Sequence, residues 1–106
     1  TTIYNRLVSY CQARRAAGFK VIICSEIDSQ SVQSDAQNWK TVILPALNAL
    51  IQANWSTFAD GLADLGANAN LMDATNTTYF NADKTHLTDT GYGIVAGLVK
   101  DQLILL

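Results

Sequence analysis

The chain has 106 residues, of which 49% are hydrophobic and 15% are charged. This composition supports one domain with a buried core and argues against a disordered chain. A formal net charge of -2 provides no basic field for a polyanion, so nucleic acid is not an expected partner. No apolar run approaches the roughly 20 residues that a membrane-spanning helix needs, so no membrane partner is expected either.

Cys11 and Cys24 are too few for a disulfide scaffold and lack the spacing of metal ligands, which favours free thiols. No cofactor is expected. The triplets at 54–56 and 76–78 fit the glycosylation sequon, and the chain is poor in lysine and rich in Asn, Thr and Ala. These features favour a secreted, extracellular protein. The first residues lack a signal-peptide pattern, so any targeting segment is expected to have been removed or to lie outside the sequence.

The first third of the chain predicts a helix, a strand and a loop. Apolar residues between 2 and 17 recur at helical spacing, and Gly18 is a natural helix end. The run from Val21 to Cys24 is continuous and apolar, as in parallel strands covered on both faces. Residues 25–34 are polar and predict a loop at the carboxyl end of this strand, where open parallel sheets bind ligands.

The middle of the chain predicts a long helix that Asp35 caps. Its apolar face runs from Trp39 to Ile51, and Pro45 inside it predicts a kink or break because proline removes a helical hydrogen bond.

The remaining elements are predicted to be short, except for the last. We expect a helix with the apolar stripe Phe58, Leu62 and Leu65, ending at Gly66. A short second strand is expected at Leu71 and Met72, followed by an Asn- and Thr-rich loop. Thr88 then caps a closing helix. The apolar face of that helix comprises Tyr92, Val95, Ala96, Val99 and Leu103.

Alternating helices and strands predict an α/β protein with a parallel sheet and helices on both sides. About two short strands would leave unpaired edges, and the strand from Val21 to Cys24 has no polar face to turn to water. We therefore expect another polypeptide, or a second copy of the chain, to cover the sheet.

His86 is the only histidine, and Asp83 lies three residues before it. Such an aspartate can hold the imidazole by one ring nitrogen and leave the other free to take a proton, although this spacing is also common in purely structural turns. A metal site of Asp83, His86 and Asp89 would be poor because it lacks a second histidine or a cysteine. Ser25 and Ser29 do not lie in a Gly-flanked elbow, so they are interpreted as loop hydroxyls.

The order of the elements and the pattern Asp83-x-x-His86-Leu-Thr-x-x-Gly91-Tyr92 resemble the C-terminal half of an SGNH (GDSL) hydrolase, a family of serine esterases and lipases. The resemblance implies a flavodoxin-like, three-layer α/β/α fold. Residues 1–106 would form the C-terminal part of a single such domain, with about two strands and four helices. It also implies that Asp83 and His86 are the acid and base of a catalytic triad. The Gly-Asp-Ser block with its nucleophile, and the oxyanion-hole glycine and asparagine, are absent from this sequence.

The resemblance therefore implies a portion of a carboxylic-ester hydrolase that acts on a small ester or an acetylated carbohydrate. An N-terminal half of the same hydrolase would supply the serine, and the chain alone is expected to be inactive. The alternative is a noncatalytic interaction or assembly module, derived from the hydrolase framework, that dimerises through its uncovered sheet edge.

Overall fold

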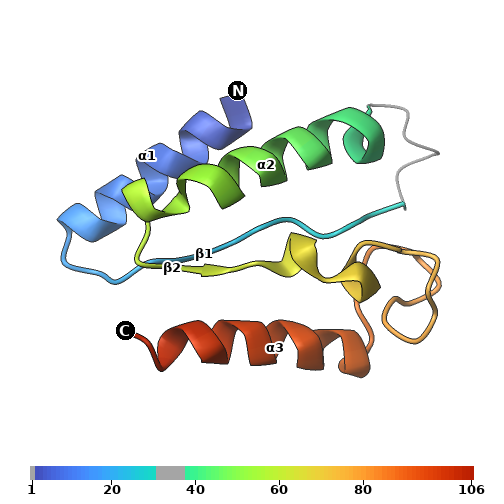
Figure 1. Ribbon diagram of the computed structural model, residues 1–106. Coiled ribbons are helices and arrows are strands. Elements are labelled where there is room, and N and C mark those ends of the chain that lie inside the picture. Colours follow the sequence, from blue (N-terminus) through green and yellow to red (C-terminus); the bar gives the residue numbers. More distant parts are fainter. Residues whose placement is uncertain (1, 31–37) are drawn as a thin grey trace.

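The structure is a computed structural model that describes residues 2–30 and 38–106. A two-stranded parallel sheet lies between α1 and α2 on one face and α3 on the other (Figure 1). The elements are α1 (Thr2–Ala16), β1 (Ile22–Cys24), α2 (Leu44–Asn54), β2 (Gly61–Ala63) and α3 (Asp89–Leu103). The α/β class is confirmed at this level. The expected Asp35 cap lies outside the described residues.

Alternation along the strands divides the core into two clusters. Ile23 of β1 and Leu62 of β2 pair in register and pack toward α1 and α2, where Ile51 and Phe58 are fully buried. Their neighbours turn to the other face, because successive strand side chains point to opposite sides. There they join the cluster beneath α3. The buried members of that cluster are Ala63, Leu65, Leu71, Ala74, Phe80 and Leu87.

Two predicted elements were wrong. The segment expected to be a helix contains strand β2, and the strand expected at Leu71 and Met72 is instead the end of a 3-10 turn, η5 (Ala69–Leu71). In β2 only Leu62 belongs to the predicted stripe, and Gly-Leu-Ala has little intrinsic strand propensity. Pairing with β1 decides its conformation. The chain therefore has two strands, as predicted, but one α-helix fewer than predicted among the described residues.

The expected irregularity at Pro45 takes the form of a change in helix type. A π-helical turn, η2 (Trp39–Ile43), runs into α2, and Pro45 occupies the first turn of α2. Just before the proline, Leu44 N donates to Trp39 O, the five-residue spacing of a π-helix, so the wider turn precedes the position at which proline lacks an N–H.

The predicted C-terminal end of α1 and the predicted N-terminal cap of α3 are confirmed. Gly18 follows α1 with φ +94°, a conformation that suits glycine, and its N–H donates to Arg15 O at 3.0 Å. Thr88 caps α3 by accepting a hydrogen bond from Gly91 N at 3.2 Å. The predicted apolar face of α3 is only partly correct, because Tyr92 is 53% exposed. The residues of α3 that pack on the core are Ile94, Val95, Leu98 and Val99.

Gly91 has a packing role that a side chain would destroy. A Cβ there would lie well inside van der Waals contact of Tyr79 O and 3.0 Å from Leu87 Cβ. Gly91→Ala is therefore expected to lower the free energy of unfolding in urea by about 1–3 kcal/mol. Gly93→Ala is the matched control, since nothing lies within 4 Å of its Cβ position. That change is expected to stabilise the chain by up to about 1 kcal/mol through helix propensity. Equal effects of the two changes would contradict this packing role.

Candidate active site

The candidate site lies at the carboxyl end of the sheet. β1 and β2 are parallel, so their carboxyl ends meet at one edge, and the segment that carries Asp83 and His86 lies beside that edge (orange in Figure 1). This is the edge at which open parallel sheets bind ligands. The predicted pair of residues is therefore brought to the predicted edge.

Asp83 and His86 contact each other directly. The Nδ1 atom of His86 lies 2.5 Å from Asp83 Oδ2. An ionised carboxylate only accepts hydrogen bonds, so Nδ1–H is the donor and Nε2 is the ring atom that can accept a proton. The side chains of His86 and Asp83 are 69% and 47% exposed. Among the described residues Asp83 is the only side chain that hydrogen-bonds the ring, which leaves Nε2 without a side-chain partner on a largely exposed imidazole.

A tight turn fixes the position of the aspartate. Asp83 Oδ1 accepts from the backbone N–H groups of Thr85 and His86, each at 3.0 Å. Lys84 between them has φ 56°, in the left-handed region. Asn81 N donates to His86 O at 2.9 Å and closes the turn at its base. Because one carboxylate oxygen holds the backbone and the other holds the ring, the orientation of the imidazole follows from the turn itself.

The turn is tied to the loop after β1. Gln30 N donates to Lys84 O at 2.9 Å, and the hydroxyl oxygens of Ser29 and Thr85 lie 3.1 Å apart. These contacts join residues more than 50 positions apart, and no pattern in the sequence predicts them. Ser29 therefore contacts Thr85, the residue before His86, and helps to fix the turn in place.

Asp28 stabilises the loop after β1 through hydrogen bonds of its buried side chain, a role that the sequence analysis missed. Its side chain is buried, and Oδ2 accepts from Ala74 N at 2.8 Å, from Gln30 Nε2 at 2.9 Å and from Lys40 Nζ at 3.2 Å. One carboxylate thus links the end of β1, the helix start at Lys40 and the segment that leads to the turn. Its place in the polar loop that follows β1 was the only available signal.

Within the described residues, no serine, threonine or cysteine side chain hydrogen-bonds the His86 ring. Ser25 is buried, donates to Asp64 Oδ1 at 2.6 Å and accepts from Gly66 N at 2.8 Å, so it is a structural hydroxyl as predicted. Cys11 and Cys24 are both free thiols. Burial raises the pKa of each thiol, and the Glu26 carboxylate raises that of Cys24 further. Both sulfurs therefore stay protonated and weakly nucleophilic near neutral pH.

No group of three or more His, Cys, Asp or Glu side chains that could hold a metal ion occurs in residues 2–30 and 38–106. No helix within those ranges is long and apolar enough to cross a bilayer. Comparisons of the chain with protein-family models, with curated proteins and with solved structures found no match.

The Asp83–His86 contact has a measurable consequence for acid titration. The hydrogen bond from His86, and then those from the backbone N–H groups, lower the pKa of Asp83 from 3.8 to about 2. His86→Ala removes the largest cause, so the carboxyl carbon of Asp83 should titrate at higher pH in NMR. Asp73 is the control, because Thr75 lowers its pKa and His86 does not contribute. An unchanged Asp83 midpoint in the variant would contradict the contact.

The lowered pKa of Asp83 makes the stability of the folded chain depend on pH. The folded chain binds the Asp83 proton less tightly than the unfolded chain does, so the contribution of the turn is present above the ordinary pKa. It is lost as the pH falls toward about 2.

Asp28 is expected to be important for stability. Asp28→Ala leaves the N–H of Ala74 unpaired in the interior and removes one partner of Lys40. The unpaired N–H accounts for most of the expected loss of about 1–3 kcal/mol, because Lys40 is 42% exposed and water solvates its charge. Urea unfolding measures it, with Asp101→Ala on the exposed surface of α3 expected to change stability by no more than about 0.5 kcal/mol. Equal stabilities of the two variants would refute this role.

Proposed function

We propose that this chain is the acid and base side of a carboxylic-ester hydrolase of the SGNH (GDSL) type. The observation that carries the proposal is the 2.5 Å contact between His86 Nδ1 and Asp83 Oδ2, on a largely exposed imidazole at the carboxyl end of a parallel sheet. This is the arrangement that a histidine general base requires.

In the proposed mechanism, His86 Nε2 takes the proton of a serine hydroxyl as that oxygen attacks the ester carbonyl. It then returns the proton to the leaving alcohol, and repeats the cycle with water to release the acid. Asp83 keeps Nδ1 protonated and stabilises the transient imidazolium. An N-terminal half of the same hydrolase supplies the serine and the oxyanion-hole donors.

The finer fold assignment belongs to the same proposal. Helices on both faces of a parallel sheet support a flavodoxin-like, three-layer α/β/α domain of which residues 1–106 form the C-terminal part. Small esters and acetylated carbohydrates are the proposed substrates. An extracellular location is proposed on the composition and the two sequons.

The second candidate is a noncatalytic assembly module that dimerises through an uncovered sheet edge. The outer edge of β1, which no described strand covers, supports it. Intact mass and sizing chromatography separate the candidates. A stable homodimer of the 106-residue chain favours the module, whereas a copurifying polypeptide of comparable length favours the hydrolase.

The esterase proposal is tested by hydrolysis of p-nitrophenyl acetate. The chain alone should show no turnover, because the nucleophile and the oxyanion donors are absent. Joining an SGNH N-terminal half with its Gly-Asp-Ser block ahead of Thr1 should produce turnover. His86→Ala should then lower kcat/KM by about 10⁴-fold, and Asp83→Asn should lower it by up to a similar factor.

Asp101→Asn removes a carboxylate at the far end of α3 and is the matched control, expected to leave the rate unchanged. Turnover by the chain alone that is abolished by His86→Ala would contradict the prediction that this chain lacks the nucleophile. A joined hydrolase whose rate does not depend on His86 would overturn the proposed function.

A further inference from the structure

The two outer edges of the sheet differ, and the difference begins with the direction of the backbone groups. Val21 O and Ser25 N both bond to β2, at 3.2 and 3.3 Å. Because successive residues of a strand direct their N–H and C=O groups to opposite sides, those of Ile22 and Cys24 point away from β2. They face an edge that no strand of the described chain covers.

The outer edge of β2 is closed. Leu62 N, which points away from β1, donates to the side-chain oxygen Oε1 of Gln102 at 3.3 Å. Gln102 belongs to α3, and its Oε1 lies 3.0 Å from the position that a Cβ on Gly61 would take. A glutamine side chain therefore occupies the place of a further strand at β2, while the place beside β1 is open.

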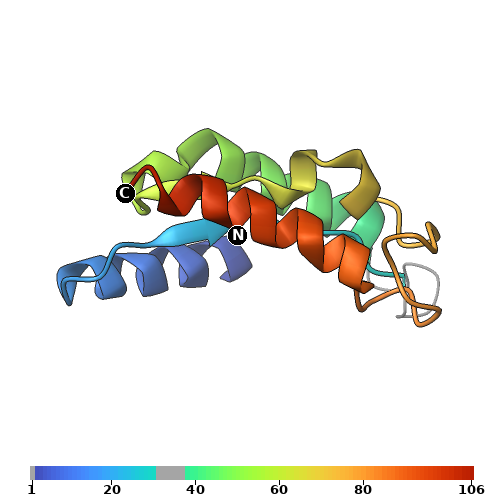
Figure 2. The same ribbon diagram turned by 90° about the horizontal axis from the view of Figure 1, so that it is seen from below.

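Helix α1 is poorly covered on this open side. Cys11 is the one buried residue among its 15, and Tyr10, which lines the groove beside β1, is 64% exposed. Figure 2 shows α1 lying beyond β1, on the side away from β2. A helix in a globular protein gains most of its stability by packing on other elements. The position of α1 fits a sheet with one more strand beside β1.

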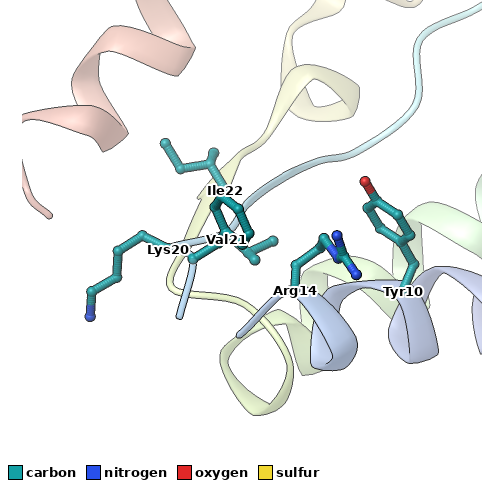
Figure 3. A pocket seen from close by; sticks show the side chains of 6 residues that line it. Tyr10, Arg14, Lys20, Val21 and Ile22 are labelled. Atoms are coloured by element: carbon teal, nitrogen blue, oxygen red, sulfur yellow. The ribbon is translucent and has the colours of Figure 1, made fainter. Parts of the chain in front are cut away.

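An open groove of about 400 Å³ lies where α1, the following turn and β1 meet (Figure 3). The residues that line it are Tyr10, Arg14, Phe19, Lys20, Val21 and Ile22. Phe19 is 61% exposed, and the Arg14 guanidinium lies 5.6 Å from the centre of the Tyr10 ring. Lys20 at the groove already pairs with Asp60 Oδ1 at 4.0 Å. The groove therefore joins apolar surface to the Arg14 guanidinium near the start of β1, and it favours an extended apolar segment with a carboxylate.

We propose that the outer edge of β1 binds an extended polypeptide segment as a third strand, parallel to β1 and covered by α1. The segment brings apolar side chains to the exposed face of α1 and a carboxylate to Arg14 at its start. A strand that precedes α1 and lies at this edge would make a right-handed crossover, the hand that parallel connections adopt. The identity of the segment, the N-terminal half of the hydrolase, rests on the proposed function.

The position of α1 opposes a second copy as the occupant. Two copies that paired antiparallel through β1 would be related by a two-fold axis normal to the sheet. Both α1 helices would then lie on the same face, and each extends beyond its own β1 toward the other (Figure 2). They would compete for the space above the paired strands. A single added strand leaves that space to one α1.

Hydrogen exchange at the edge amides tests the proposal. A designed strand of about seven residues, alternating Val and Thr after an initial Glu, is joined through a Gly-Ser loop ahead of Thr1. In a parallel ladder the outward N–H groups of Ile22 and Cys24 gain partners, so their exchange measured by NMR should slow by at least about 10-fold. Ile23 N already faces β2, so its amide is the internal control.

A Gly-Ser segment of equal length is the matched control and should give no protection. Arg14→Glu in the fused chain should reduce the protection, whereas Arg6→Glu, which does not line the groove, should not. Equal exchange at Ile22 and Cys24 with the designed strand and with the Gly-Ser segment would overturn the proposal. So would a dimer of the unfused chain in sedimentation experiments, with these amides already protected.

Amide exchange and ester turnover, measured on the same joined hydrolase, test the third strand and the esterase separately. Protection of the edge amides in the hydrolase joined to an N-terminal half, without ester turnover, would reject the esterase alone. Turnover in that joined hydrolase with Ile22 and Cys24 still exchanging freely would reject the edge assignment alone.

Discussion

Parallel pairing of β1 with β2 is the constraint on which the rest of the structure depends. It directs both strands to finish at the same edge and sends alternate side chains into two separate core clusters. Helices must then cover both faces, because neither face of such short apolar strands is polar. The loops that leave the common edge converge there, and among them is the turn that carries Asp83 and His86.

The geometry of the site is maintained by contacts between distant parts of the chain. Asp83 orients the imidazole locally, but Gln30 and Ser29 fix the turn against the end of β1, and buried Asp28 fixes that end in place. An exposed histidine on an otherwise mobile turn would spend little time in one orientation. These polar anchors supply the preorganisation that a general base needs, without burying the ring.

Another strand can pair with the sheet at the outer edge of β1 but not at the outer edge of β2, which Gln102 occupies. Gln102 bonds to the outer edge of β2, whereas α1 lies beyond β1, on the side where no described strand pairs with it. Unpaired edges are usually protected by charge, by proline or by a covering element. At β1 no described element gives this protection, which is consistent with the proposed third strand at this edge.

The sequence by itself determined α1, β1, α3 and the Asp83–His86 pair, because each is encoded locally by periodicity, a cap or a short spacing. Tertiary structure alone decided β2, since Gly-Leu-Ala becomes a strand only where β1 offers a partner. It likewise decided the roles of Asp28 and Gln102, whose partners lie tens of residues away in the chain. Local free energies specify helices and turns, whereas pairing and burial depend on which distant segments meet.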